Sequence, residues 1–270
     1  MVGMKIAFIG GGNMGEAMLS AVLEKGLGLP QDIAVSDINE SRLQHLHQKY
    51  HVGVTGNNQL VTHRAQVVVL AVKPQNLGDV MAELSGHLRP ALLLLSIIAG
   101  ARIDTLCQGL EHPFVVRAMP NTPAQIGEGI TVWTATSQVA QHQKEWARSI
   151  LGVMGKEVYV DDERLLDMAT AVSGSGPAYL YFFIEALTDA AVHIGLPRDV
   201  ARELVMETVL GAAHLLQKSG KDPAELRKMV TSPGGTTAAA IAKLEEADFA
   251  SLILQAISAA HDRAKELGSK

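Results

Sequence analysis

A run of glycines near the start of the chain limits the possible folds more than any other feature. Gly10–Gly15 reads G-G-G-N-M-G and fits the pattern G-x-G-x-x-G. It follows an apolar, strand-like segment, Lys5–Ile9, and it opens Asn13–Lys25, where apolar residues recur at helical spacing. A strand, a glycine turn and a helix in this order predict the first unit of a parallel α/β sheet. The turn itself predicts a site for the pyrophosphate of a dinucleotide.

Each glycine of this pattern has its own expected role. Gly10 permits the tight turn, Gly12 lets the backbone approach a pyrophosphate, and Gly15 lets the helix pack closely on the strand. Asn13 and Met14 complete the expected cradle, because backbone N–H groups and the helix dipole favour an anion at this N-terminus. The alternative is a glycine-rich strand-to-helix turn that binds nothing.

The choice between NAD and NADP stays open at the level of sequence. Asp37 closes the second predicted strand about 20 residues after the glycines, where a carboxylate grips the ribose hydroxyls of NAD and repels the 2′-phosphate of NADP. Against this, Ser36 can donate a hydrogen bond to a phosphate, and we expect Arg42 and Arg64 to lie within reach of one.

The rest of the chain divides at about residue 160. Up to that point, strand-like runs alternate with helical stretches, which predicts a Rossmann-like, doubly wound parallel sheet over residues 1–160. From residue 161 to 270 long Ala/Leu stretches predict an all-α domain. The predicted further strands are Ile33–Ser36, Gln66–Val72, Ala91–Ile98 and Phe114–Ala118, with a helix at Ser41–Tyr50. The predicted helices of the second domain are Ser175–Ile194, Pro197–Lys218, Ala224–Val230, Gly235–Leu244 and Phe249–Leu267.

The helices of the second domain are apolar on more than one side. Gly174–Ile184 and Ala256–Ala260 offer little polar surface to water. A small helical domain of this kind usually buries its apolar surface in another copy of itself, so we expect a homodimer or a higher homo-oligomer. The alternative is a tightly packed monomer.

Composition excludes several classes of protein. A formal charge of −5 argues against a nucleic-acid binder, and the ten histidines show no metal-ligand spacing. The most apolar run, Ala91–Ile98, is far shorter than the roughly 20 residues that cross a bilayer. The N-terminus enters a strand pattern at once, without a leader, and Cys107 is the single cysteine. We therefore expect a cytoplasmic protein with no metal, membrane or nucleic-acid partner.

Five motifs, spread over nearly the whole chain, resemble those of one enzyme family. In chain order they are Phe8–Gly15 (FIGGGNMG), Ala71–Gln75 (AVKPQ), Arg117–Pro123 (RAMPNTP), Ser173–Tyr179 (SGSGPAY) and the long segment Pro223–Glu245. This set is similar to the motifs of the pyrroline-5-carboxylate reductases, which carry out the last step of proline synthesis. The resemblance implies hydride transfer from a reduced nicotinamide to the ring C=N of 1-pyrroline-5-carboxylate, giving L-proline. It also implies NADP as the coenzyme, with NAD possible because of Asp37.

The segment Thr231–Thr237 (TSPGGTT) is the predicted substrate site. Free N–H groups at Gly235 and Thr236, with the hydroxyls of Ser232 and Thr237, make a seat for a small anion at a helix start. The resemblance implies that Thr237 hydrogen-bonds the substrate ring and acts as a weak proton donor, and that Thr236 contacts the carboxylate through its backbone. It adds Gly234 and Glu163 to the substrate site. The alternatives are a capped helix start at this turn, and for Glu163 a first-turn glutamate favoured by the helix dipole.

The resemblance also extends the predicted coenzyme site beyond the glycine turn. It places Ala71, Val72, Lys73 and Pro74 at the end of a strand beside the coenzyme, where ligands of open parallel sheets lie. It implies that the loop at Asn121 closes over the nicotinamide. The remaining residues it implies are Asn58 near the adenosine ribose, and Ser175 and Gly176 at the helix facing the nicotinamide. An ordinary strand-to-helix junction, loop or helix start is the alternative for each.

Two other functions use the same glycine turn. A β-hydroxyacid dehydrogenase needs a basic residue, usually a lysine on a helix of the second domain, and Ser173–Thr188 contains no lysine. A nucleotide-binding sensor that catalyses nothing would need the glycine turn but not the second anion site. No acid–base pair is required for the reductase reaction, because an imine can enter already protonated.

Overall fold

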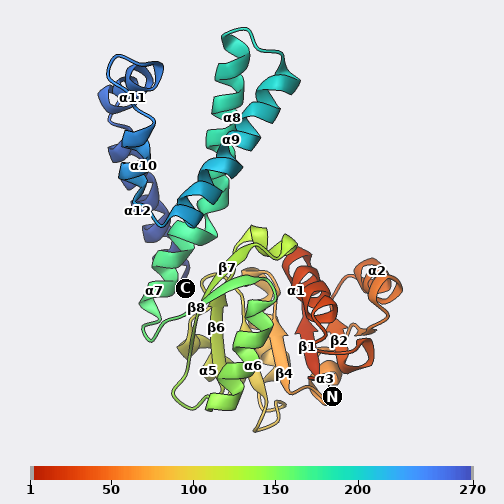
Figure 1. The fold of residues 1–270 in the computed structure, drawn as a ribbon. Coiled ribbons are helices and arrows are strands. Elements are labelled where there is room, and N and C mark those ends of the chain that lie inside the picture. The colour runs from red at the N-terminus through yellow and green to blue at the C-terminus, as the bar shows by residue number, and fades with distance from the viewer. Residues whose placement is uncertain (1–2, 269–270) are drawn as a thin grey trace. The chain divides into compact units, whose positions relative to one another are not determined.

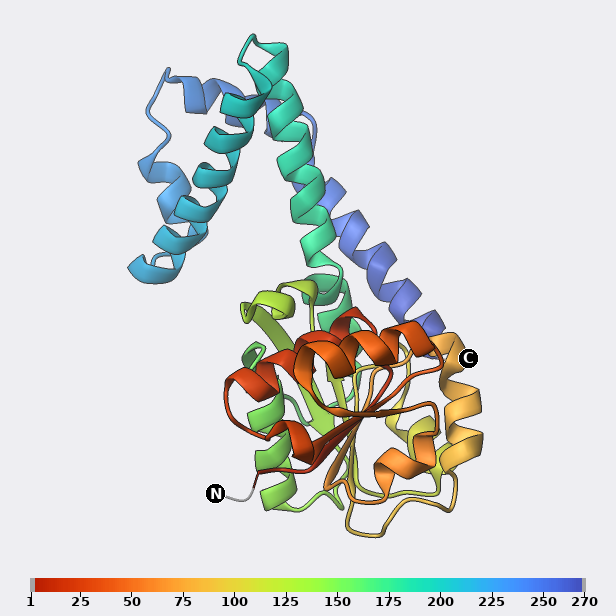
Figure 2. The ribbon, with the colours of Figure 1, turned by 90° about the vertical axis from the view of Figure 1, so that its right-hand side faces the viewer.

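The computed structural model describes residues 3–268, which form two compact units. The first unit contains residues 3–175 and the C-terminal segment 260–268, and the second contains residues 176–259 (Figures 1 and 2). The predicted change from sheet to helices at residue 160 lies shortly before α7 (Arg164–Ala169), which packs with the first unit.

The first unit is built on one sheet of order β3-β2-β1-β4-β5-β6-β7-β8. Neighbouring strands pair in parallel, except that β6 and β7 are antiparallel. The doubly wound parallel arrangement is therefore confirmed for β1 to β6, whereas β7 and β8 run the other way at one edge. The strands are β1 (Ile6–Ile9), β2 (Ile33–Ser36), β3 (Gly53–Thr55), β4 (Val67–Leu70), β5 (Leu93–Ser96), β6 (Val115–Met119), β7 (Gly129–Ala135) and β8 (Gly155–Tyr159).

Helices cover both faces of this sheet, and each face has its own apolar core. Side chains of one strand alternate between the cores: Phe8 packs with α1 and α6, whereas Ile9 packs with α3, α4 and α5. The helices of the unit are α1 (Asn13–Glu24), α2 (Glu40–Tyr50), α3 (Asn58–Thr62), α4 (Leu77–Leu84), α5 (Ile103–Leu110), α6 (Gln141–Gly152) and α7. Short 3-10 turns are η1 (Pro30–Asp32), η2 (Pro74–Asn76) and η3 (Thr122–Ile126), and η4 (Thr170–Gly174) is a π-helical turn.

The second unit is entirely helical, as predicted. Its helices are α8 (Gly176–His193), α9 (Arg198–Ser219), α10 (Pro223–Met229), α11 (Thr236–Glu246) and the first half of α12 (Phe249–Gly268). The helices α8 and α9 lie side by side as a hairpin (Figures 1 and 2).

This helical unit buries little of its own apolar surface. Among its described residues only Ala201 and Val205 are buried apolar residues in the single chain. Large apolar side chains stay exposed on α8, α9 and α12, for example Phe182, Leu204 and Leu254. The described part of the chain has no helix long and apolar enough to span a membrane.

Candidate active site

A cavity of about 610 Å³ opens at the carboxyl ends of the parallel strands β1, β2 and β4. This is the edge at which open α/β sheets bind their ligands, and the volume is typical of a cofactor site. Nine of the predicted coenzyme residues line it: Gly10, Gly12, Asn13, Ser36, Asp37, Asn58, Ala71, Val72 and Lys73. Arg42, Asp79 and Glu83 also line it.

The glycine turn has the conformation and the open space expected of a pyrophosphate-binding turn. Gly10 has a φ of +99°, and a Cβ there would lie 2.6 Å from the carbonyl oxygen of Ala71. At Gly15 a Cβ would lie 2.3 Å from the carbonyl oxygen of Gly10, so the helix packs on the turn as predicted. A Cβ at Gly12 would meet no protein atom within 4 Å. The open space at Gly12 is on the cavity side, where a pyrophosphate would approach the backbone.

Asp37 holds the turn together. Its Oδ2 accepts a hydrogen bond from the N–H of Gly11 at 2.7 Å, and its Oδ1 accepts one from the N–H of Asn39 at 2.9 Å. The carboxylate therefore links the glycine turn to the loop between β2 and α2. It also lines the cavity at the end of β2, the position at which a carboxylate meets the adenosine ribose.

Arg42, on α2, also connects this helix to the glycine turn and to α1. Its Nε donates a hydrogen bond to the carbonyl oxygen of Gly11 at 2.5 Å, and its Nη2 donates to Glu16 on α1. Glu16 also accepts from Lys49 at 3.0 Å and from Tyr50 at 2.9 Å. Partial burial raises the pKa of Glu16, but these hydrogen bonds and the charge of Arg42 outweigh it and lower the pKa to about 2. The carboxylate of Glu16 is therefore ionised at neutral pH.

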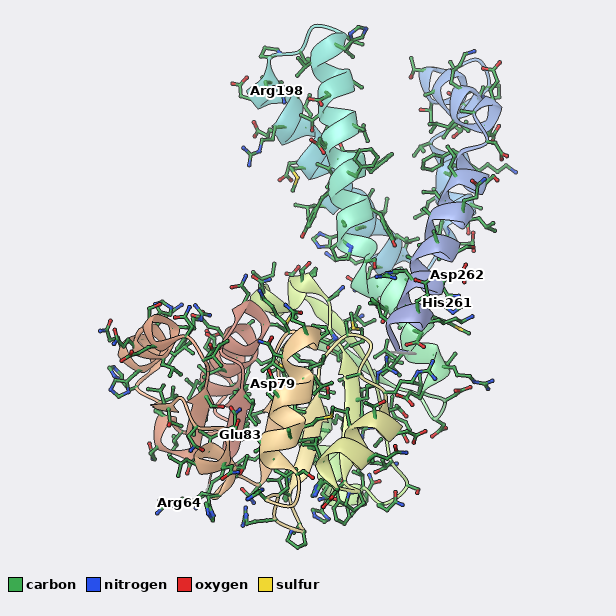
Figure 3. All side chains as sticks on the ribbon, turned by 180° about the vertical axis from the view of Figure 1, so that it is seen from behind. Arg64, Asp79, Glu83, Arg198, His261 and Asp262 are labelled. Carbon is green, nitrogen blue, oxygen red and sulfur yellow. The ribbon has the colours of Figure 1, made fainter. Side chains whose placement is uncertain are left out.

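Glu83 is a cavity residue that sequence reasoning missed. Its carboxylate accepts hydrogen bonds from the backbone N–H and the side-chain Nδ2 of Asn58, at 3.1 and 2.7 Å. The Oδ1 of Asn58 in turn accepts from the hydroxyl of Ser36 at 2.6 Å. The hydroxyl of Ser36 therefore donates its hydrogen bond to Asn58 and not toward the cavity. Glu83 fixes the amide of Asn58, and it lies one turn after Asp79 on α4 (Figure 3).

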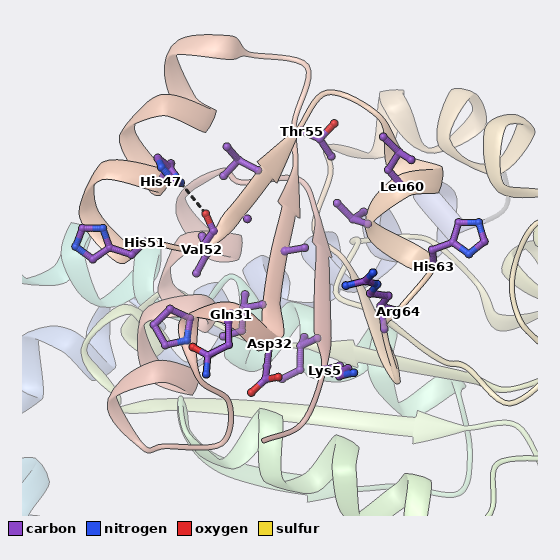
Figure 4. Close-up of a pocket in the computed structure, with 18 residues that line it drawn as sticks. Lys5, Gln31, Asp32, His47, His51, Val52, Thr55, Leu60, His63 and Arg64 are labelled. Carbon is purple, nitrogen blue, oxygen red and sulfur yellow. Dashed lines mark hydrogen bonds between the residues drawn. The ribbon is translucent and has the colours of Figure 1, made fainter. Parts of the chain in front are cut away.

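Arg64 is not near this cavity, so the expectation that it reaches a coenzyme phosphate is wrong. It lies at the other end of the first unit (Figure 3), where it lines a second cavity of about 930 Å³ beside the edge strand β3. Figure 4 shows this cavity, in which a ring nitrogen of His47 lies 2.9 Å from the carbonyl oxygen of Val52. The short helix α3 ends two residues before Arg64 and so directs it away from the carboxyl ends of the strands.

Glu163 is the partly exposed member of an ion cluster whose other members, Arg117 and Asp167, are buried. Its Oε1 accepts hydrogen bonds from Nη1 of Arg117 at 2.8 Å and from the backbone N–H of Ile103 at 2.9 Å. The other Nη of Arg117 donates to Asp167 at 2.9 Å. The E-x-x-x-D spacing of Glu163 and Asp167 therefore places two carboxylates on one guanidinium, which ties the start of α7 to β6. A contact of Glu163 with substrate stays a prediction.

The predicted substrate turn lies in the second unit, at the start of α11. Gly234 has a φ of +71°, and Gly235 is the N-cap residue of the helix. The N–H of Gly235 donates to the carbonyl oxygen of Ser232 at 3.0 Å, so the expectation of a free N–H at Gly235 is wrong. Within the described chain the N–H groups of Thr236 and Thr237, in the first turn of the helix, have no acceptor. The free N–H groups of this turn are therefore those of Thr236 and Thr237, and their role as a seat for an anion stays a prediction.

The remaining predicted coenzyme residues lie outside the cavity lining. Met14 packs on the apolar core beneath the sheet, and Pro74 begins the turn η2. The side chain of Asn121 accepts a hydrogen bond from the N–H of Ile130 at 2.9 Å. Ser175 ends the π-helical turn η4, and Gly176 begins α8 in the second unit. A role for these residues in binding stays a prediction.

Two family models match the chain. Residues 163–267 match the pyrroline-5-carboxylate reductase dimerisation domain. Residues 5–100, which contain the glycine turn and the cavity residues up to Glu83, match the model described as NADP oxidoreductase, coenzyme F420-dependent.

Curated relatives are similar to this chain over nearly their whole length. The pyrroline-5-carboxylate reductase of Synechocystis is 42% identical over 99% of this chain and 99% of the relative, and that of Pseudomonas aeruginosa is 40% identical over 98% and 97%. Among solved structures, the Coxiella burnetii enzyme superimposes with a TM-score of 0.89 at 37% identity, covering 98% of both chains. A Plasmodium falciparum pyrroline carboxylate reductase with NADP bound gives 0.89 at 30% identity, covering 99% of both.

Proposed function

The chain belongs to the pyrroline-5-carboxylate reductase family, and we propose that it reduces the ring C=N of 1-pyrroline-5-carboxylate to give L-proline. The observation that supports this most strongly is the similarity of nearly the whole chain to pyrroline-5-carboxylate reductases. The cavity at the carboxyl ends of β1, β2 and β4, with its glycine turn, supports the binding of a dinucleotide that the reaction requires. When bound there, a reduced nicotinamide nucleotide supplies the hydride. The protein contributes binding, orientation and electrostatics.

The proposed coenzyme is NADPH, with NADH also accepted. The match of residues 5–100 to an NADP oxidoreductase model supports NADP, as does a guanidinium, that of Arg42, in the cavity lining. Asp37 supports the use of NADH, because its carboxylate lies where ribose hydroxyls bind. Since both oxygens of Asp37 already accept backbone N–H groups, its negative charge is partly compensated.

The proposed substrate seat is the start of α11. The N–H groups of Thr236 and Thr237 are available to a carboxylate, and the helix dipole favours an anion there. The hydroxyl of Thr237 would hydrogen-bond the ring nitrogen and serve as a weak proton donor. The rate enhancement would then come from orienting an electrophilic iminium rather than from a strong acid.

The proposed assembly is a homodimer or a larger homo-oligomer formed by the helical unit. The match of residues 163–267 to a dimerisation domain supports it, as do the exposed apolar side chains of α8, α9 and α12. A cytoplasmic location stays a prediction from the single cysteine.

The test of the reaction is an assay of the purified protein with pyrroline-5-carboxylate and each reduced coenzyme, following the loss of nicotinamide absorbance. We expect turnover with both coenzymes and more efficient turnover with NADPH. Oxidation of hydroxyisobutyrate-like acids, without reduction of pyrroline-5-carboxylate, would instead identify a β-hydroxyacid dehydrogenase.

The variant Thr237→Val separates an enzyme from a sensor. It removes the hydroxyl at the proposed substrate seat and leaves the coenzyme cavity intact, so we expect most turnover to be lost while coenzyme affinity is retained. Thr105→Val on α5, an exposed threonine of the first unit, is the matched control and should leave both unchanged. Unchanged turnover in Thr237→Val would show that the seat is assigned wrongly.

A further inference from the structure

Arg42 is the one guanidinium that lines the coenzyme cavity in the described part of the chain. It lies near the end of β2 together with Asp37 and Asn39, where a dinucleotide presents its adenosine ribose. An arginine at this place accommodates the 2′-phosphate that distinguishes NADP from NAD. Among the residues that line the cavity, Arg42 is therefore the one best able to distinguish NADP from NAD in binding.

The charge of Arg42 is already engaged by a carboxylate outside the cavity. Its Nη2 donates to Glu16, whose side chain does not line the cavity, and its Nε donates to the carbonyl oxygen of Gly11. The side chains of Arg42 and Glu16 are 24% and 15% exposed, so water screens this pair less than it screens a surface pair. A 2′-phosphate would have to compete with Glu16 for the same guanidinium.

Glu16 is held in place by groups other than Arg42. Lys49 and Tyr50 of α2 donate to it at 3.0 and 2.9 Å, and a ring nitrogen of His45 lies at 3.3 Å. These partners keep the carboxylate ionised and fixed whether or not Arg42 stays with it. Arg42 can therefore turn from Glu16 toward a phosphate without leaving a buried charge unpaired.

We propose that Glu16, acting through Arg42, sets the preference of this enzyme between NADPH and NADH. The carboxylate of Glu16 withholds the guanidinium from the 2′-phosphate, which lowers the affinity for NADPH but not for NADH, since NADH carries no phosphate at that position. Glu16 is thus a positioning residue for coenzyme selection. This inference rests on the proposed coenzyme site in the cavity of the first unit.

The test is a double-mutant cycle of Glu16 and Arg42, read by coenzyme binding as well as by turnover. The probes are adenosine 2′,5′-bisphosphate and 5′-AMP, which differ only in the 2′-phosphate, with NADPH and NADH in parallel. We expect Glu16→Gln to bind the bisphosphate and NADPH about fivefold more tightly, as for the loss of a competing charge pair. Its affinity for 5′-AMP and NADH should not change.

Two further variants establish the route of the effect. Arg42→Gln should weaken binding of the bisphosphate and NADPH, and adding Glu16→Gln to it should change nothing more. Glu24→Gln on the same helix is the matched control, because Glu24 carries the same charge and, among the described residues, bonds only the hydroxyl of Ser20. Should Glu16→Gln lower the melting temperature strongly, Glu16→Asp serves in its place and should shift selectivity in the same direction by less.

Three results would overturn the inference. They are an equal change for both probes in Glu16→Gln, an effect of Glu16→Gln that persists without Arg42, and an equal effect of Glu24→Gln. Failure of the proposed reaction would look different: both nucleotides would bind, with the selectivity changes intact, but pyrroline-5-carboxylate would not be reduced with either coenzyme.

Discussion

Replacing Arg117 with methionine should lower the free energy of unfolding by about 3 kcal/mol, the lower end of the range for breaking a buried ion pair. The side chain of Arg117 is 5% exposed and that of its partner Asp167 is 8% exposed, so loss of the guanidinium leaves Asp167 charged and unpaired away from water. Glu163 is 29% exposed and can be hydrated, which places the loss at the lower end rather than the upper.

Urea titration at one fixed protein concentration measures this loss, because the stability of an oligomer depends on concentration. Arg164→Met is the control: Arg164 pairs with Asp162 on the surface and its side chain is 85% exposed, so its loss should leave the free energy of unfolding almost unchanged. The double variant Arg117→Met/Asp167→Leu should recover at least half of the lost stability, since it removes the unpaired charge. A loss below about 1 kcal/mol in Arg117→Met, or no recovery in the double variant, would refute this reasoning.

Other consequences of the structure concern the coenzyme cavity and its surroundings. Gly12→Ala should weaken coenzyme binding at least about tenfold and leave the melting temperature unchanged, because its Cβ would enter only the space of the ligand. Gly15→Ala should lower both the coenzyme affinity and the melting temperature, because its Cβ would meet the backbone of Gly10. A binding titration with a parallel thermal melt separates the two, and an unchanged affinity in Gly12→Ala would contradict the cradle. Glu83→Gln should raise the KM for the coenzyme several-fold with little change in kcat, because glutamine offers Asn58 one acceptor oxygen fewer than glutamate does. Steady-state kinetics in which kcat falls instead would argue against a positioning role for Glu83. The contribution of Glu16 to the free energy of unfolding should be fully present above its unfolded pKa of 4.5 and be lost as the pH falls toward about 2. The free energies of unfolding of the native protein and of Glu16→Gln, measured at a series of acid pH values, should therefore converge over this window.

The fold could be predicted where periodicity is strong. The alternating runs that form β1, β2 and β4 and the Ala/Leu stretches of α8 to α12 were placed to within a few residues. No strand is predicted from the sequence at β3, β7 or β8. The strand β3 is only three residues long, and β8 alternates polar residues at a half-exposed edge. The reversal at β7 depends on pairing between distant segments, which local pattern does not encode.

The candidate site divides in the same way. Its glycine turn and Asp37 follow from local spacing, so sequence places them on the cavity correctly. Glu83, Glu16 and the Arg117 cluster could not be predicted, because each acts through a partner more than 20 residues away. The expectation of a free N–H at Gly235 is wrong for a local reason, because this N–H donates to the carbonyl oxygen of Ser232 within the same turn.

Transfer of deuterium tests the proposed reaction most directly. Nicotinamide coenzyme labelled with deuterium at the transferred position of C4 is incubated with the protein and 1-pyrroline-5-carboxylate, and the product is analysed by mass spectrometry and chiral chromatography. The account predicts L-proline with one deuterium at C5, from NADPH and to a lesser extent from NADH. Bound coenzyme with no labelled proline from either one would contradict it.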